Sequence, residues 1–136
     1  MNKYPIKMAP AFKDYIWGGD KLKKHWNKNS SFDKVAEAWE LAAHINGSSV
    51  CENGEYKGIT LLELFEKYPE IVKPDYKGDK FPVLIKLIDA KDDLSIQVHP
   101  SDEYAKREND SGKTEMWYIV DCDENAHLIL GLTKTI

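Results

Sequence analysis

The feature that most constrains how this chain can fold is the run of residues 94–100, Leu-Ser-Ile-Gln-Val-His-Pro. Apolar and polar side chains alternate along it, and this period of two predicts a half-buried β-strand. Side chains two positions apart on a strand point to the same face, so Gln97 and His99 are expected to project together, roughly 7 Å apart at their bases. An amide oxygen and an imidazole nitrogen at that spacing can bind one ion.

A second run, residues 112–120, also has the pattern of a strand and carries Glu115. On a neighbouring strand, the Glu115 carboxylate can lie beside the side chains of Gln97 and His99. One nitrogen with two oxygens is a ligand set that Zn²⁺ accepts, with room for water or substrate. Spacing alone favours the simpler interpretation, in which Gln97 and His99 only line a polar sheet face. Further segments of the sequence favour the metal interpretation.

Five segments stand in a specific order along the chain. They are Tyr-Ile-Trp-Gly-Gly at residues 15–19, Glu-Ala-Trp-Glu at 37–40, Phe-Pro-Val-Leu-Ile-Lys-Leu-Ile-Asp-Ala at 81–90, the run at 94–100, and Lys-Thr-Glu at 113–115. Together they resemble the zinc-dependent type I mannose-6-phosphate isomerases in their shorter bacterial form, a branch of the cupin superfamily. The resemblance covers essentially the whole chain.

The predicted fold is mainly β. Short strands joined by turns, with helices kept to the periphery, indicate an antiparallel sandwich or barrel. The resemblance implies a cupin-type jelly-roll barrel with a few short peripheral helices. Family members are much longer and have two cupin-like halves. Residues 1–136 are therefore expected to be an N-terminal metal-binding domain, truncated before the end of the barrel and without the second half.

Two helices are predicted from their start signals. Thr60 and Glu63 form a capping box ahead of an apolar stripe, which predicts a helix at residues 60–68. Asp20 follows two glycines, and its side chain is expected to cap a short helix at residues 21–26.

Two further segments are assigned to strands. Residues 35–43 have helical propensity, but the resemblance implies a strand, on which Glu37 and Trp39 share one face. The pair Asn-Gly at 53–54 predicts a tight hairpin that joins residues 48–51 to residues 55–58.

The resemblance assigns roles to particular side chains. It implies zinc ligation by Gln97, His99 and Glu115, with one further histidine from a later strand. Lys113 shares the face of Glu115, and it is expected to contact substrate oxygens or transfer a proton. A solvated lysine is an equally weighted alternative. Trp17 is expected to wall the sugar site, although a tryptophan beside two glycines is more often a packing anchor.

The other histidines are not expected to bind the metal. His127 is the only histidine after His99, and it lies too early for the family's fourth ligand, so it is interpreted as a surface or rim residue. His25 and His44 have no matching partner and are expected to make ordinary polar contacts.

Composition limits the binding partners and the cellular compartment that are expected for this chain. The net charge of −4 gives no basic footprint for nucleic acid. No stretch is apolar enough to span a membrane, and the first residues lack a signal-peptide core, so a cytoplasmic protein is expected. Cys51 and Cys122 are too few for a disulfide framework and are expected to stay reduced.

Three functions are weighed. The first is an isomerase that interconverts mannose 6-phosphate and fructose 6-phosphate, present here as its N-terminal part and inactive alone. The second is a non-catalytic metal- or sugar-binding cupin module, and the third is a β-domain whose Gln97 and His99 do no chemistry. The sequence favours the first lineage over the third. An incomplete barrel also leaves open sheet edges, through which copies of the chain can associate.

Overall fold

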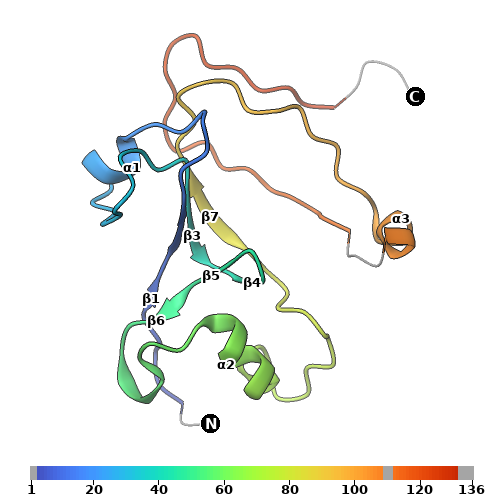
Figure 1. Ribbon diagram of the computed structural model, residues 1–136. Helices are drawn as coiled ribbons and strands as arrows, with labels where there is room; N and C mark the ends of the chain where they lie inside the picture. The colour runs from blue at the N-terminus through green and yellow to red at the C-terminus, as the bar shows by residue number, and fades with distance from the viewer. Residues whose placement is uncertain (1–2, 109–111, 132–136) are drawn as a thin grey trace. The chain divides into compact units, whose positions relative to one another are not determined.

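The computed structural model describes residues 3–108 and 112–131 (Figure 1). The chain divides into two units, residues 1–94 and residues 95–136. Every strand that the structure describes lies in the first unit, and all of the strand pairs are antiparallel. The prediction of a mainly β fold with short helices is confirmed.

A three-stranded sheet forms the centre of the first unit, in the order β2-β3-β7. Its strands are β2 (Ala11–Lys13), β3 (Glu37–Leu41) and β7 (Ile85–Ile88). The strand expected from the resemblance at residues 35–43 is therefore confirmed in β3. Ala38 is fully buried in a cluster with Leu22 and Val35. Packing of this small side chain against its neighbours outweighs its helical propensity.

Two smaller sheets complete the strands of this unit. One pairs β1 (Met8–Ala9) with β6 (Val50–Cys51), and the other pairs β4 (Ala43–His44) with β5 (Gly47–Ser48).

The tight hairpin predicted at residues 53–54 is wrong. Asn53 has φ −134°, whereas a two-residue type I′ turn needs positive φ at both central positions, and only Gly54 has it, with φ 64°. Gly54 instead begins the short 3₁₀-helix η1 (Gly54–Tyr56). The loop closes further out, where the backbone N–H of Gly58 donates to the carbonyl of Cys51 at 2.8 Å.

Helix α2 (Leu61–Lys67) begins as its sequence predicts. The Thr60 hydroxyl accepts a hydrogen bond from the backbone N–H of Glu63 at 3.2 Å, and the Glu63 carboxylate accepts one from the N–H of Thr60 at 2.9 Å. Leu61, Leu64 and Phe65 are buried. The helix is followed by a 3₁₀-turn, η2 (Pro69–Ile71).

Helix α1 (Lys21–Lys24) is shorter than predicted, and its expected cap is wrong. Asp20 makes no side-chain hydrogen bond to the helix backbone. The buried carboxylate of Asp89 takes that position and accepts from the backbone N–H of Lys21 at 2.7 Å. A local pattern cannot identify a cap that comes from so far along the chain.

The second unit contains helix α3 (Asp102–Ala105) and the 3₁₀-turn η3 (Lys106–Glu108). The Ser101 hydroxyl caps α3 by accepting from the backbone N–H of Tyr104 at 3.3 Å. Among the residues the structure describes, no helix is long and apolar enough to cross a bilayer.

The strands predicted at residues 94–99 and 113–120 are not observed. Neither segment is helical, and in the described part of the chain neither is paired into a sheet. Their backbones meet through a hydrogen bond from the N–H of Lys113 to the carbonyl of Pro100, at 3.2 Å. Alternation reports which face of a segment is apolar, but a strand also needs a ladder of hydrogen bonds with a partner.

Candidate active site

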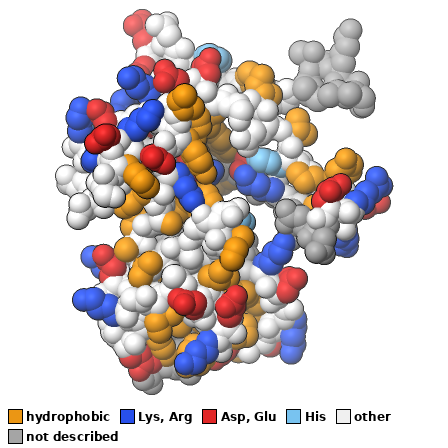
Figure 2. All heavy atoms as spheres, in the orientation of Figure 1, with side chains coloured by type: hydrophobic (Ala, Val, Ile, Leu, Met, Phe, Trp, Pro, Cys, Tyr) orange, Lys and Arg blue, Asp and Glu red, His pale blue; other side chains and the backbone are white. Residues whose placement is uncertain are grey.

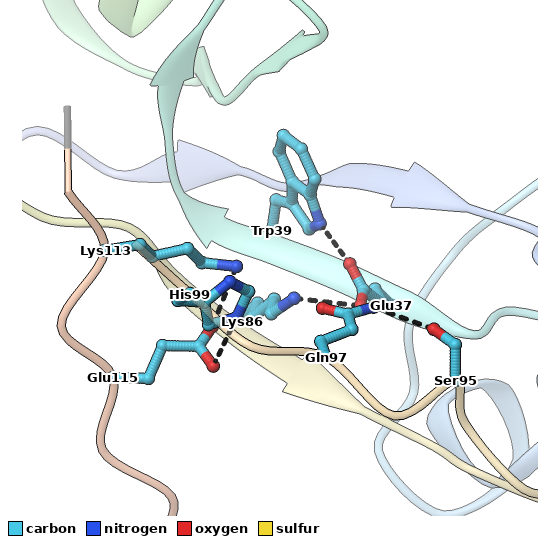
Figure 3. Close-up of polar contacts among 8 residues, drawn as sticks. All are labelled: Glu37, Trp39, Lys86, Ser95, Gln97, His99, Lys113 and Glu115. Atoms are coloured by element: carbon cyan, nitrogen blue, oxygen red, sulfur yellow. Dashed lines mark hydrogen bonds and ion pairs between the residues drawn. The ribbon is translucent and has the colours of Figure 1, made fainter. Parts of the chain in front are cut away.

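A cluster of polar side chains lies in the second unit, around the carboxylate of Glu115 (Figure 3). Its Oε2 atom is 3.0 Å from Nε2 of His99, and its Oε1 atom is 2.8 Å from Nζ of Lys113. The hydrogen bond between Lys113 and Pro100 holds the two segments together next to these side chains. The structure therefore brings together three of the residues that the sequence singled out.

The surroundings of Glu115 keep its carboxylate ionised. Partial burial raises its pKa, but the hydrogen bond and positive charge of Lys113 outweigh that effect, with smaller contributions from His99 and a hydrogen bond with Trp117. The net result is a pKa below the ordinary value for glutamate. A carboxylate that is charged at neutral pH can bind a metal ion or form an ion pair with the Lys113 ammonium.

The amide nitrogen of Gln97 hydrogen bonds within its own segment. Its amide Nε2 donates to the hydroxyl of Ser95 at 2.9 Å, two residues earlier on the same segment (Figure 3). The predicted convergence of all three ligands is thus shown only for His99 and Glu115.

The His99–Glu115 pair fits one edge of a zinc site. Ligand atoms bound tetrahedrally at roughly 2.0–2.1 Å from Zn²⁺ lie about 3.3 Å apart, and the observed separation of Nε2 and Oε2 is 3.0 Å. Within residues 3–108 and 112–131, no three His, Cys, Asp or Glu side chains are grouped to hold a metal. Among these described residues, the Gln97 amide is the further ligand that the resemblance implies.

Trp17 lies in a loop of the first unit, and backbone hydrogen bonds hold this loop in place. The carbonyl of Trp17 accepts from the N–H groups of Lys91 and Asp92 at 3.0 and 3.1 Å. The next two residues must be glycine, because a Cβ on Gly18 would lie 2.5 Å from Cβ of Ala36 and one on Gly19 would lie 2.5 Å from Oδ2 of Asp89. The close approach of Ala36 and Asp89 explains why two glycines follow Trp17. The sugar-binding role of Trp17 stays a prediction.

Sequence reasoning missed a buried charge cluster in the first unit. Glu37 is 5% exposed, and its carboxylate accepts from Nε1 of Trp39 at 2.6 Å and binds Nζ of Lys86 at 2.9 Å (Figure 3). Trp39 and Lys86 are register partners on β3 and β7. Two features of the sequence could have indicated this cluster. Lys86 is a lysine within the otherwise apolar run 81–90, and Glu37 and Trp39 lie two residues apart on the strand that pairs with it.

Two of the remaining histidines, His44 and His127, lie at the surface. His44 is exposed, and its Nδ1 accepts from the backbone N–H of Asn46 at 3.0 Å, while its ring lies edge-on to Trp39. His127 is exposed, in agreement with its interpretation as a surface residue.

Comparison with known proteins identifies the lineage. A model of the type I phosphomannose isomerase catalytic domain matches residues 6–134. Mannose-6-phosphate isomerase ManA of Bacillus subtilis is 47% identical over 99% of this chain, and the mannose-6-phosphate isomerase of Streptococcus mutans is 41% identical over 93%. The crystal structure of the mannose 6-phosphate isomerase from Bacillus subtilis superposes with a TM-score of 0.84 over 91% of this chain, at 46% identity.

These findings define first a fold class, a mainly β protein with the fold of a solved mannose 6-phosphate isomerase. More particularly, the chain belongs to the type I phosphomannose isomerase family and matches its catalytic domain. It spans 43% of the length of ManA and 40% of the chain in the solved structure.

Proposed function

We propose that residues 1–136 form the N-terminal, metal-binding part of a zinc-dependent aldose–ketose isomerase acting on mannose 6-phosphate and fructose 6-phosphate. The observation that carries the proposal is the Glu115 carboxylate, held between the imidazole of His99 and the ammonium of Lys113. The names of the relatives supply the substrate class.

The reaction moves a proton between adjacent carbons of an open-chain sugar. It needs a base of matched pKa and a positive group near the oxygen on which charge develops. Zn²⁺ held by His99, Glu115 and the Gln97 amide would supply an electrophile for the sugar oxygens.

Lys113 is proposed as the catalytic residue of this chain. Its ammonium is held 2.8 Å from Oε1 of Glu115, so its position is fixed while its remaining N–H donors stay available. A donor in this place can hydrogen bond a substrate oxygen or donate a proton to it. Trp17 is proposed to cover an apolar face of the sugar.

Two further parts of the proposal concern the activity of the isolated chain and its cellular compartment. The chain alone is expected to turn over little or no substrate, because it spans only 43% of the length of ManA. We also propose the cytoplasm as its compartment, because Cys51 and Cys122 are both unpaired.

A non-catalytic metal- or sugar-binding module is the second candidate. A coupled assay for fructose 6-phosphate separates the two. The assay compares the isolated chain with a chimera in which the chain replaces the matching part of Bacillus subtilis ManA.

The isomerase proposal expects an active chimera. Lys113→Met should lower its kcat/KM about 100-fold or more, and Lys106→Met, a matched exposed lysine of the same unit, should leave it unchanged. An inactive but folded chimera, or a fully active Lys113→Met variant, would contradict the proposal.

A further inference from the structure

The sequence contains two Asn-Gly pairs, at residues 46–47 and 53–54, and the proposed function uses neither of them. Asparagine is a labile residue, and a following glycine has no side chain to hinder attack by its backbone nitrogen on the carboxamide. That nitrogen bonds to Cγ as the Cγ–Nδ2 bond breaks, ammonia leaves with the former amide proton, and a cyclic succinimide remains. Water then opens the ring to aspartate or isoaspartate, so the residue gains a negative charge.

The carboxamide of Asn53 is held by hydrogen bonds at both of its ends. Its Oδ1 accepts from the backbone N–H of Lys7 at 2.8 Å, and its Nδ2 donates to the carbonyl of Pro5 at 3.0 Å. The segment that it grips is anchored in turn by Tyr4, whose ring stacks on that of Tyr56 at a centroid distance of 5.7 Å. Cγ of Asn53 can turn towards the next backbone nitrogen only after both hydrogen bonds open, so the fold protects this residue.

Asn46 is held less firmly. It is exposed in the turn that joins β4 to β5, and each of these strands is only two residues long. Its contacts with the other described residues are made by its backbone. The N–H of Asn46 donates to Nδ1 of His44 at 3.0 Å, and its carbonyl accepts from the ammonium of Lys13. A short ladder opens locally at little cost, and no clamp like that of Asn53 has to be released.

The glycine that follows Asn46 is favoured by packing. A Cβ on Gly47 would lie 3.1 Å from Nζ of Lys13 and 3.2 Å from Cε3 of Trp39, which is tighter than ordinary contact. The crowding that favours glycine at position 47 therefore also leaves the attacking nitrogen without a side chain to hinder it.

We propose that Asn46 is a site of spontaneous deamidation in the folded protein, whereas the hydrogen bonds of Asn53 protect that residue. The co-reactant is water, and no enzyme is needed. The inference uses only the first unit and does not depend on the proposed function.

The new carboxylate has a defined neighbour. Positive and negative side chains are interspersed on the face shown in Figure 2, so the effect of one added carboxylate depends on the cations close to it. Beside residue 46 lies Lys13, whose ammonium bonds the carbonyl of Asn46 and lies 4.6 Å from the ring centroid of Trp39. Deamidation should therefore draw Lys13 towards residue 46 and change the surroundings of the Trp39 ring.

The test incubates the native chain at mildly alkaline pH and follows both asparagines by peptide mapping with mass spectrometry. In the folded chain, we expect residue 46 to deamidate at least about tenfold faster than residue 53. In denaturant the two rates should converge, because each asparagine then precedes a glycine in an open chain. Equal rates in the folded chain, or faster modification of residue 53, would overturn the proposal. So would a folded chain that keeps both amides for as long as the denatured chain needs to lose them.

A variant isolates the protective contacts. Tyr4→Ala removes the ring that anchors the segment bound by Asn53, and it should speed deamidation there at least about fivefold while leaving the rate at Asn46 unchanged. Tyr15→Ala, at an exposed tyrosine of the same unit, is the matched control and should change neither rate. An unchanged rate at Asn53 in a Tyr4→Ala chain with native circular dichroism would show that these contacts do not protect it. If Tyr4→Ala unfolds, the comparison of the native chain with and without denaturant still decides.

The effect on Lys13 is tested with Asn46→Asp, which introduces the product carboxylate directly. In heteronuclear NMR spectra, the assigned indole N–H resonance of Trp39 should shift in this variant. Asn46→Gln keeps an uncharged amide at the same position and should leave the resonance in place. An indole resonance that moves in neither variant, or equally in both, would refute the coupling to Trp39.

Discussion

The carboxylate of Asp89 accepts a hydrogen bond from the backbone N–H of Lys21 at 2.7 Å, across 68 positions of sequence. The same residue accepts from the N–H of Gly19 through its carbonyl, at 3.1 Å, and donates its own N–H to Ala36 at 2.9 Å. Asp89 therefore ties the start of α1 and the glycine pair after Trp17 to the central sheet.

Removal of this cap should destabilise the fold. Asp89→Ala leaves the first N–H of α1 without its acceptor, and we expect it to lower the free energy of unfolding by about 1–2 kcal/mol. Asp89→Asn retains an acceptor oxygen and should lose less. Chemical denaturation measures both, and Asp20→Ala, at the position that does not cap the helix, is the control that should change little. Equal losses at Asp20 and Asp89 would show that the cap is assigned to the wrong residue.

The ion pair between the buried Glu37 and the half-buried Lys86 gives a second stability prediction. Lys86→Met removes the cation and leaves a carboxylate that is 5% exposed without its charge partner. A loss of about 3 kcal/mol in the free energy of unfolding is expected. The double variant Glu37→Gln with Lys86→Met removes both charges and should recover most of the loss.

The matched control for this pair is Lys7→Met. Lys7 pairs with Glu52 at 2.9 Å on the surface, with side chains that are 75% and 41% exposed. Its loss should be less than about 1 kcal/mol. A double variant as unstable as Lys86→Met would mean that packing of the lysine stem, and not its charge, is responsible.

The capping box of α2 predicts a pH dependence. Hydrogen bonds from the side chain and backbone of Thr60 lower the pKa of Glu63 below its ordinary value of 4.5. A lowered pKa in the folded state means that the contribution to stability is present above the unfolded pKa and is lost as pH falls through the folded value. In an NMR titration, Thr60→Ala should raise the pKa of Glu63, and Thr60→Ser should keep it low. A pKa that is the same in all three proteins would contradict the hydrogen-bond assignment.

Local chemistry explains which elements were predictable. The capping box of Thr60 and Glu63 lies within four residues, so the sequence pattern alone predicts α2. The mainly β class followed from the short alternating runs joined by turns. Strand β3 followed from the resemblance, since the propensity of residues 35–43 favoured a helix. The contacts of Asp89, and those of Glu37 with Lys86, join distant residues, so no local pattern identifies them.

The candidate site was also predictable only where its residues lie close together in the sequence or belong to the motifs of the resemblance. Two-residue alternation predicted that Lys113 and Glu115 lie close together, and their side chains form an ion pair at 2.8 Å. The resemblance added His99 to this pair. Alternation did not fix the rotamer of Gln97, whose amide hydrogen bonds with Ser95 at 2.9 Å. It also could not supply ladder partners for residues 94–99 and 113–120, because pairing depends on what lies alongside a strand.

The central claim is that His99 and Glu115 form an edge of a zinc site. The most direct measurement is zinc binding at controlled free zinc by equilibrium dialysis and elemental analysis, on the native chain and on Glu115→Gln, His99→Ala and Lys113→Met. We predict about one zinc per native chain. Loss of either ligand should weaken affinity beyond the 10–100-fold expected for an outer-shell change, with Glu115→Gln the more damaging because it removes the ligand charge. Lys113→Met should retain the metal. Equal zinc binding by the native chain, Glu115→Gln and His99→Ala would contradict the claim.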